Sequence, residues 1–211
     1  MAKRKIKLTR PELKRQRDAL ERFERYLPML KLKQQLLQLT VRQTQQRRRE
    51  LHAAALEAAK TVLRYGALLH DRAGVDVRGL AEPEQIRTSR ENIAGVNVPV
   101  FEDLSFPEAR YSLFATPPWV DRAAADLKEL RRRRAELDVV TERYDLLSRE
   151  LTRIIQRVNL FEKVKIPEAR ENIRRIRIRL GDEMTAAVAR AKIAKNKLAP
   201  QQTAGGKEGA A

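Results

Sequence analysis

The chain has 211 residues, of which 35% are charged and only 5% aromatic, and its formal net charge is +17. So few aromatic residues argue against a large compact core, whereas the abundance of Leu, Ala, Arg, Lys and Glu is typical of long helices and coiled coils. The absence of cysteine excludes disulfides and thiolate metal sites. The sequence contains no run of about 18 apolar residues, so it predicts no membrane span. The charge alone is compatible with nucleic acid, anionic lipid or an acidic protein as partner.

Residues 1–70 predict a long N-terminal helix. Apolar residues recur along it at heptad spacing, which is the pattern of a coiled-coil seam. They are Leu13, Leu20, Phe23, Leu27, Leu30, Leu37, Val41, Leu51, Ala55, Ala58, Val62 and Tyr65. Four polar residues share the seam and either fix its register or mark a hydrated end: Gln16, Gln34, Thr44 and Arg48. Pro28 predicts a kink or local break near Tyr26.

Residues 120–198 predict a second long helix with the same heptad pattern. Its seam residues are Leu130, Leu137, Val140, Tyr144, Leu147, Leu151, Ile154, Val158 and Phe161. Pro167 interrupts the pattern, which resumes in a frame shifted by one residue at Ile173, Ile176, Leu180, Ala187 and Ala194. A kink with a change of register is therefore expected at Pro167.

The middle of the chain, residues 71–119, is rich in proline and aromatic residues and has an acidic balance, so it is expected to form a separate small module. Residues 92–101 and 111–114 predict the two strands of a short β-hairpin. Pro99 would confine the first of them to a sheet edge. Residues 199–211 have no periodicity and predict a disordered tail.

Two helices with apolar stripes bury those stripes best by folding back on each other. The expected fold class is therefore all-α: a long antiparallel two-helix coiled coil formed by the N- and C-terminal helices, with a small middle module that contains a short β-hairpin. If Tyr65 lies opposite Ala125, Arg47–Arg49 would come near Glu142, and Arg131–Arg134 near Glu57. Such exposed pairs contribute about a few tenths of a kcal/mol each.

Motifs for catalysis are missing from the sequence. It contains no phosphate-binding glycine loop, no dinucleotide fingerprint and no hydrolase nucleophile elbow. His52 and His70 each stand without a second ligand at metal spacing. We therefore expect no catalytic residue, no cofactor and no metal. The basic clusters on the helices are either solvated surface or guidance toward acidic loops of a partner: Arg47, Arg48, Arg49, Arg131, Arg132, Arg133 and Arg134.

Three segments, in order along the chain, resemble the D subunits of vacuolar-type and archaeal or bacterial A-type ATPases. Residues 157–167 are similar to that family's R-V-N-x-hydrophobic-E-x-V-x-I-P signature, and residues 91–102 to its N-[IV]-x-G-V-x-[VL]-P segment. Residues 9–13 and 30–36 resemble its T-R-x-E-L and L-L-K-x-K-x-x-x-L patterns. The signature residues that are candidates for partner contacts are Asn92, Gly95, Val96, Pro99, Arg157, Val158, Asn159, Glu162, Ile166 and Pro167. Of these, Val158 is expected in the helical core, and Asn159 and Glu162 at the surface.

The resemblance implies a non-catalytic central stalk of a V/A-type rotary ATPase or ATP synthase, which transmits torque between a catalytic A/B hexamer and a membrane ring that moves ions. The implied partners are the A and B subunits, the small F subunit and the funnel-shaped stalk subunit (C or d). The implied location is the cytoplasmic face of a membrane, through the complex. A basic coiled-coil protein that binds nucleic acid is the alternative, and a generic helical adaptor is a third possibility. The transported ion and the direction of catalysis stay open.

Overall fold

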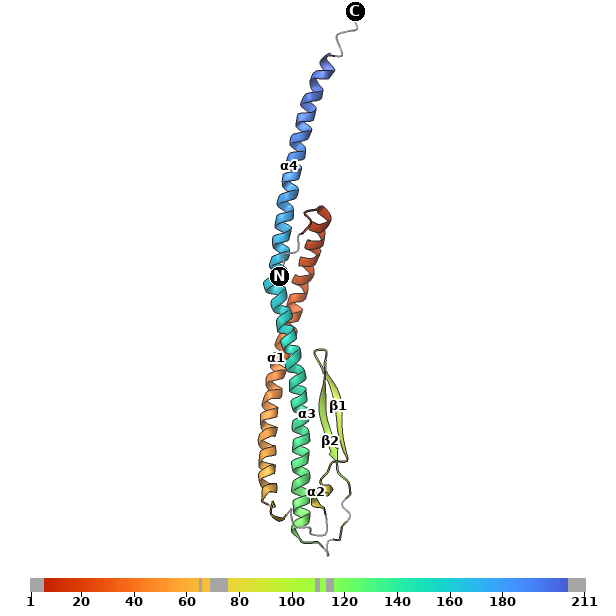
Figure 1. Cartoon of the computed structure of the whole chain (residues 1–211), viewed down its shortest axis with the longest axis vertical. Helices are drawn as coiled ribbons and strands as arrows, with labels where there is room; N and C mark the ends of the chain where they lie inside the picture. The colour runs from red at the N-terminus through yellow and green to blue at the C-terminus, as the bar shows by residue number, and fades with distance from the viewer. Residues whose placement is uncertain (1–5, 65, 69–75, 109–110, 113–115, 205–211) are drawn as a thin grey trace, which may run out of the picture. The chain divides into compact units, whose positions relative to one another are not determined.

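Along the sequence, a long helix precedes the two strands of a small sheet, and long helices follow it (Figure 1). The structure is a computed structural model that describes residues 6–64, 66–68, 76–108, 111–112 and 116–204. Its elements are α1 (Arg10–Leu63), α2 (Val77–Leu80), β1 (Gln85–Ile93), β2 (Val96–Ser105), α3 (Trp119–Leu160), the π-helical turn η2 (Phe161–Lys165) and α4 (Ile166–Ala204). The predicted fold class is confirmed.

By its internal contacts the chain divides into two compact units. Unit 1 comprises Met1–Leu30 and Arg157–Ala211, and unit 2 comprises Lys31–Gln156. Both boundaries fall inside long helices. The predicted segments end at residues 70, 119 and 198, near the ends of helices, whereas the boundaries of the units lie within helices. That division into segments stays a prediction.

In unit 2, α1 and α3 lie side by side and run antiparallel (Figure 1). Lys33 pairs with Glu150 at 3.6 Å, and Arg47, further along α1, pairs with Glu136, earlier in α3, at 2.8 Å. The seam between the helices is apolar: Leu37, Leu51 and Leu147 are at most 1% exposed. Burial of each such side chain stabilises the pair by about 1.5–3 kcal/mol.

The register of this pair differs from the predicted one. Arg47 meets Glu136 instead of Glu142, six residues nearer the start of α3, or about 9 Å at 1.5 Å per residue. Residues 131–134 do not reach Glu57, which pairs with Lys60. The prediction was wrong because the first turns of α3 are held in a small core with α2, which the heptad pattern does not indicate.

That small core lies where α2 meets the first turns of α3. Val77, Val120, Ala123 and Ala124 are buried in it, and Tyr111, Trp119 and Leu127 pack against it. Asp76 caps α2 by accepting a hydrogen bond from the backbone N–H of Arg78 at 3.1 Å. Tyr111 donates its hydroxyl hydrogen to Asp121 Oδ1 at 2.5 Å, and this hydrogen bond raises the pKa of Tyr111.

Helix α1 runs without a break through Pro28, so a local break there is excluded. Proline removes one backbone donor, so one hydrogen bond of the helix is missing there, but the helix continues on both sides. Two of the polar seam residues have contacts that accommodate them. Thr44, 7% exposed, donates its hydroxyl to the carbonyl oxygen of Thr40 at 2.8 Å, and Arg48 lies over the ring of Tyr144 at 4.4 Å. These contacts explain how the seam accommodates polar groups.

The hairpin is formed by different residues from those predicted. β1 and β2 pair antiparallel from Ile93↔Val96 at the turn to Gln85↔Ser105 at the base, with a bulge between Arg87 and Thr88. The predicted first strand, residues 92–101, is thus the end of β1, the turn and the first part of β2. Residues 111 and 112 are not in a strand, and residues 113 and 114 lie outside the described residues. β1 was missed because it is polar and largely exposed, so it shows no apolar alternation.

In unit 1, α1 packs antiparallel on η2 and α4. Phe23 and Phe161 pack with their rings tilted by 52° and ring centroids 5.1 Å apart. Asn172, which is 7% exposed, donates to Gln16 at 3.4 Å. The π-helical turn inserts one extra residue relative to an α-helix. Ile154 and Val158 are buried before it, and Ile173 and Ile176 after it in a frame shifted by one residue. The predicted change of frame is confirmed, and Pro167, which cannot donate to residue 163, accounts for its place.

Beyond Leu180, α4 has no partner among the described residues. Every side chain from Gly181 to Lys197 is exposed, including Ala187 and Ala194, which were predicted to continue the seam. The helix extends to Ala204 and so includes the first residues of the predicted tail, residues 199–204, while the disorder of that tail stays a prediction. Extending an existing helix costs far less than starting one, which outweighs the weak local pattern. Residues 205–211 lie outside the described residues.

Candidate functional site

The tip of the hairpin is a two-residue turn in which Ala94 has φ 51° and Gly95 φ 81°. Positive φ at both central residues defines a type I′ turn. Asn92 accepts the backbone N–H of Gly95 at 3.0 Å and donates to Asn97 at 2.6 Å, directly across the sheet. Three of the four signature residues here, Asn92, Gly95 and Val96, therefore build the turn itself. The fourth, Pro99, lies opposite Arg90 in β2, a strand with one unpaired edge.

The hairpin is attached along α3 (Figure 1). Glu91 pairs with Arg143 at 3.0 Å and Asp103 with Arg132 at 3.3 Å. Near its base, Lys128 lies 5.5 Å from the centre of the Phe106 ring. At its tip, a Cβ added to Gly95 would lie 3.8 Å from Lys33 Nζ, so the turn also approaches α1.

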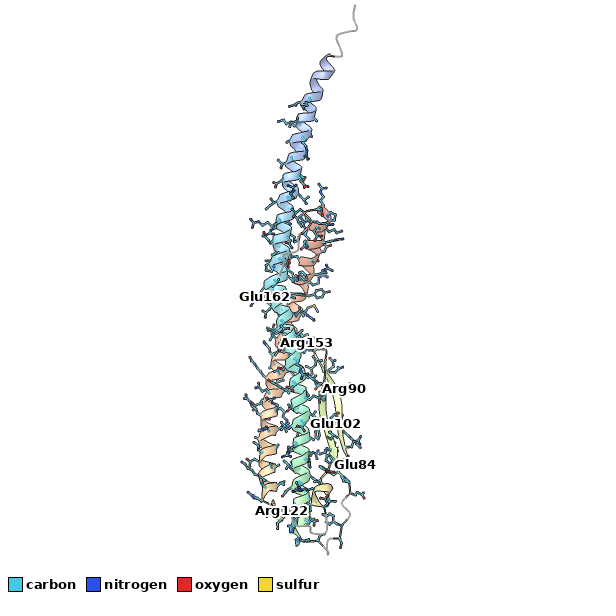
Figure 2. All side chains as sticks on the ribbon, viewed as in Figure 1. Glu84, Arg90, Glu102, Arg122, Arg153 and Glu162 are labelled. Atoms are coloured by element: carbon cyan, nitrogen blue, oxygen red, sulfur yellow. The ribbon has the colours of Figure 1, made fainter. Side chains whose placement is uncertain are left out.

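One face of the hairpin holds it to the helices, and the other is open. Val98 and Leu104 of β2 are at most 5% exposed. On the open face, charged side chains such as Arg90 and Glu102 are exposed (Figure 2). Glu102 is the bulge residue, because Arg87 pairs with Asp103 and Thr88 with Phe101. The open face of the hairpin therefore carries exposed charged side chains that a partner can contact.

The predicted basic faces are partly occupied by contacts within unit 2. Arg47 pairs with Glu136 and Glu50, Arg132 with Asp103, and Arg133 with Glu129 and Glu136. Arg48 is half-buried against Tyr144. The exposed members with no ion pair among the described residues are Arg49, Arg131 and Arg134. These three are the members free to meet a partner.

The C-terminal signature, residues 157–167, coincides with the π-helical turn and its flanks. Val158 and Ile166 are buried at 6% and 7% exposure, and they hold the turn in the seam. Arg157, Asn159, Glu162 and Pro167 are exposed. The expectation that Val158 lies in the core and Asn159 and Glu162 at the surface is confirmed. These residues belong to unit 1 and the hairpin residues to unit 2, so the structure describes two separate surfaces.

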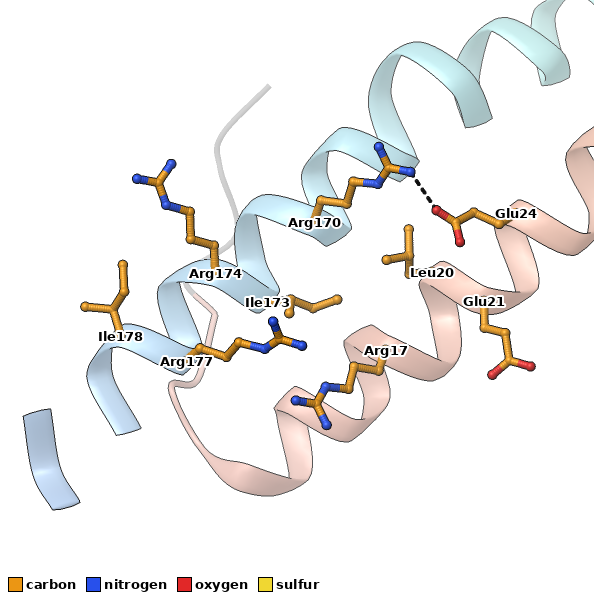
Figure 3. Close-up of a pocket in the computed structure, with 9 residues that line it drawn as sticks. All are labelled: Arg17, Leu20, Glu21, Glu24, Arg170, Ile173, Arg174, Arg177 and Ile178. Carbon is orange, nitrogen blue, oxygen red and sulfur yellow. Dashed lines mark hydrogen bonds and ion pairs between the residues drawn. The ribbon is translucent and has the colours of Figure 1, made fainter. Parts of the chain in front are cut away.

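A third surface was not predicted: a groove between α1 and α4 within unit 1 (Figure 3). It encloses about 550 Å³. Its lining residues are Arg17, Leu20, Glu21, Glu24, Arg170, Ile173, Arg174, Arg177 and Ile178. The sequence carried a weak signal for it, since the arginines flank Ile173, yet only the pairing of α4 with α1 shows that Arg17 faces them.

None of these surfaces has the features of a catalytic or metal centre. The described residues contain no group of three His, Cys, Asp or Glu side chains that could hold a metal ion. His52 is exposed, and His70 lies outside the described residues. None of the described helices has an apolar stretch of the length that a membrane span requires. The described residues form paired long helices with a docked hairpin, which define the class of helical coiled-coil proteins that carry a small sheet.

Comparison with known proteins gives the family. A profile of the family described as the D subunit of ATP synthase matches residues 12–196. A protein of Borreliella burgdorferi, named as the D subunit of a V-type ATP synthase, is 38% identical over 194 residues, covering 92% of this chain and 95% of that protein. Proteins of the same name from Chlamydia abortus and Chlamydia muridarum are 34% identical over 194 residues, covering 92% of this chain and 93% and 96% of theirs. The chain belongs to the D-subunit family of ATP synthases.

Proposed function

We propose that this chain is the non-catalytic central shaft of a V-type ATP synthase and transmits torque between the catalytic ring and the membrane rotor. The observation that carries the proposal is the pairing of α1, of 54 residues, with α3 in unit 2 and with η2 and α4 in unit 1. A shaft must resist bending and twisting over a long distance, and a two-helix coiled coil provides this resistance where a loop does not.

A shaft must also be asymmetric, because it has to present different contacts to each catalytic site in turn and so favour a different conformation of each. The surfaces described above are unequal within each unit. Unit 2 has a hairpin on α3 only, and unit 1 has a basic groove and, from Gly181 to Lys197, a stretch of α4 whose residues are all exposed. Such unequal surfaces support a role in which rotation changes the contacts that each site receives.

The proposed partners are the A and B subunits around unit 1, which contains both chain ends, and the small F subunit and the funnel-shaped stalk subunit beside unit 2. This arrangement rests on the resemblance of residues 91–102 and 157–167 to the family's signatures. The chain would lie at the cytoplasmic face of the membrane and be held there by protein contacts alone.

The absence of cysteine allows a direct test. Glu102→Cys introduces a single thiol at an exposed bulge, to which a bead is attached after assembly with the A, B and F subunits of the same genome. With the A and B subunits fixed to a surface, addition of ATP is expected to turn the bead in one direction. Arg122→Cys, exposed at the start of α3, serves as a second attachment point.

A chain that joins the complex while both beads stay still during ATP hydrolysis would contradict the shaft. Failure to join the complex, together with binding of duplex DNA at about 150 mM salt, would favour the nucleic-acid alternative, since phosphate contacts make such binding strongly salt-dependent.

A further inference from the structure

The groove between α1 and α4 holds positive charge that the described chain does not neutralise. Its two acidic residues already have partners: Glu24 pairs with Arg170 at 2.8 Å, and Glu21 with Arg25 at 2.9 Å. Among the described residues, no carboxylate lies within ion-pairing distance of Arg17, Arg174 or Arg177. Three guanidinium groups therefore line one groove without a counter-charge.

Two of these arginines come from opposite sides. Arg17 lines the groove from α1 and Arg177 lines it from α4 (Figure 3). Like charges held on facing helices repel each other, and this repulsion is relieved when an anion lies between them. The guanidinium group suits a carboxylate because its planar fork donates two parallel hydrogen bonds.

The groove also has an apolar part. Leu20 is half-buried, Ile173 is 7% exposed, and Ile178 is 56% exposed at the rim. A phosphate chain or a nucleic-acid backbone gives these side chains nothing to contact. A peptide with carboxylates on either side of a leucine satisfies both parts, and a volume of about 550 Å³ is in the range of sites that hold several side chains.

We propose that this groove is a binding site for an acidic segment of a partner protein, with carboxylates on Arg17 and Arg177 and an apolar side chain on Leu20, Ile173 and Ile178. The proposal deepens the shaft function and rests on it for the identity of the partner, which would be a subunit of the ring around unit 1. Its chemistry is independent of that function and can be tested with the full chain alone.

The test measures binding of a fluorescein-labelled peptide, Glu-Glu-Leu-Glu-Glu-Leu-Glu, by fluorescence anisotropy at about 100 mM salt. The double variant Arg17→Glu/Arg177→Glu is expected to weaken binding at least about tenfold, since hydrogen bonds to charged groups are among the stronger ones. The control Arg190→Glu/Lys195→Glu makes the same charge change at exposed positions of α4 outside the groove and is expected to weaken binding less than about threefold. Circular dichroism of both variants checks that each keeps its helical content.

Two further probes separate the site from general attraction to a basic chain. The peptide with serine in place of leucine is expected to bind at least about fivefold more weakly, since the apolar contacts are lost. Tripolyphosphate is expected to compete only weakly. Equal losses in the two double variants, no effect of the leucines, or a preference for tripolyphosphate or duplex DNA would overturn the proposal.

The ring then provides a separate readout. If the wild-type chain fails to join the A and B subunits but binds the peptide through the groove, the shaft function fails and the groove chemistry stands. If the wild-type chain joins the ring and turns, yet binds no peptide at about 1 mM, the groove proposal fails and the shaft function stands.

Discussion

The two units bury their helices by different means. In unit 2, the seam of α1 and α3 is supplemented by a small core at one end and by a hairpin that pairs with α3 through Arg143 and Arg132. In unit 1, the described helices have only each other, and α4 continues from Gly181 to Lys197 with every side chain exposed. The difference indicates that unit 2 stabilises itself, whereas much of α4 has contacts to gain from a partner.

The units also differ in how their seams keep frame. The unit 2 seam follows one heptad pattern, while the chain enters the α4 part of unit 1 through a π-helical turn that shifts the pattern by one residue. In a seam with one heptad frame, any inserted or deleted residue rotates the residues after it out of the seam. Where the helix already contains an extra residue, deletion of that residue restores a regular frame. The largest expected effect tests this difference.

Deletion of Val164, combined with Pro167→Ala, removes the extra residue and should leave Ile173 and Ile176 in the seam. We expect the free energy of unfolding to change by less than about 1 kcal/mol. Deletion of the exposed Arg149 with the same Pro167→Ala change rotates Ile154 and Val158 out of the seam and should cost about 3–6 kcal/mol. Denaturant unfolding followed by circular dichroism measures both, and equal losses would contradict the role of η2.

The next prediction compares a buried residue of the α1–α3 seam with an exposed residue of α4. Leu147→Ala, at a position that is fully buried, should lower the free energy of unfolding by about 2–5 kcal/mol because it leaves a cavity. Val188→Ala, at 69% exposure in α4, should change it by less than about 0.5 kcal/mol in the isolated chain. The same denaturant titration applies. A large loss for Val188→Ala would mean that α4 is already packed in the free chain.

The hairpin turn gives a smaller effect of known sign. Gly95→Ala puts a side chain at φ 81° and should destabilise the hairpin by about 1–2 kcal/mol. Ala94→Asn should stabilise it by about 0.5–1 kcal/mol, since asparagine tolerates the φ of 51° and Asn-Gly suits a type I′ turn. Hydrogen exchange of the β1 and β2 amides reports the change. Opposite signs are required, and two losses would argue against this turn geometry.

The smallest effect separates the two ion pairs that attach the hairpin. Arg143, 23% exposed, should contribute more through Glu91 than Arg132, 51% exposed, does through Asp103. We expect losses of up to about 1 kcal/mol for Arg143→Ala and a few tenths for Arg132→Ala. Both losses should shrink at high salt because exposed charges are screened. Hydrogen exchange at low and high salt measures them, and a larger loss for Arg132→Ala would reverse this ranking.

The helices were predictable because their signal is long and redundant. Leu37, Leu51, Leu147 and Ile154 recur at heptad spacing, and where the two helices pair, a residue at such a position is buried whichever register they adopt. The frame shift at Pro167 was predictable for the same reason, since the repeat on both sides of it is visible in the sequence. The register itself depended on the small core of α2 and α3, which has no periodic signal.

The surfaces were less predictable. β1 carries mostly polar, exposed residues, so nothing in its pattern distinguishes it from a loop. The groove requires Arg17 and Arg177 to face each other, although they are far apart in the sequence, and no local pattern encodes that pairing. The signature residues were found through resemblance, and their role in partner contacts stays a prediction.

The antiparallel pairing also affects the order in which the chain can fold during synthesis. Arg47 and Glu136, partners in the folded chain, are 89 residues apart in the sequence. At roughly 5–20 residues per second, about 4–18 s separate their emergence from the ribosome. During that time the apolar side of α1, including Leu37 and Leu51, has no α3 to cover it, whereas the hairpin can close as soon as residue 105 is made. The nascent chain therefore exposes an unpaired leucine stripe that a chaperone or a neighbouring chain can bind first.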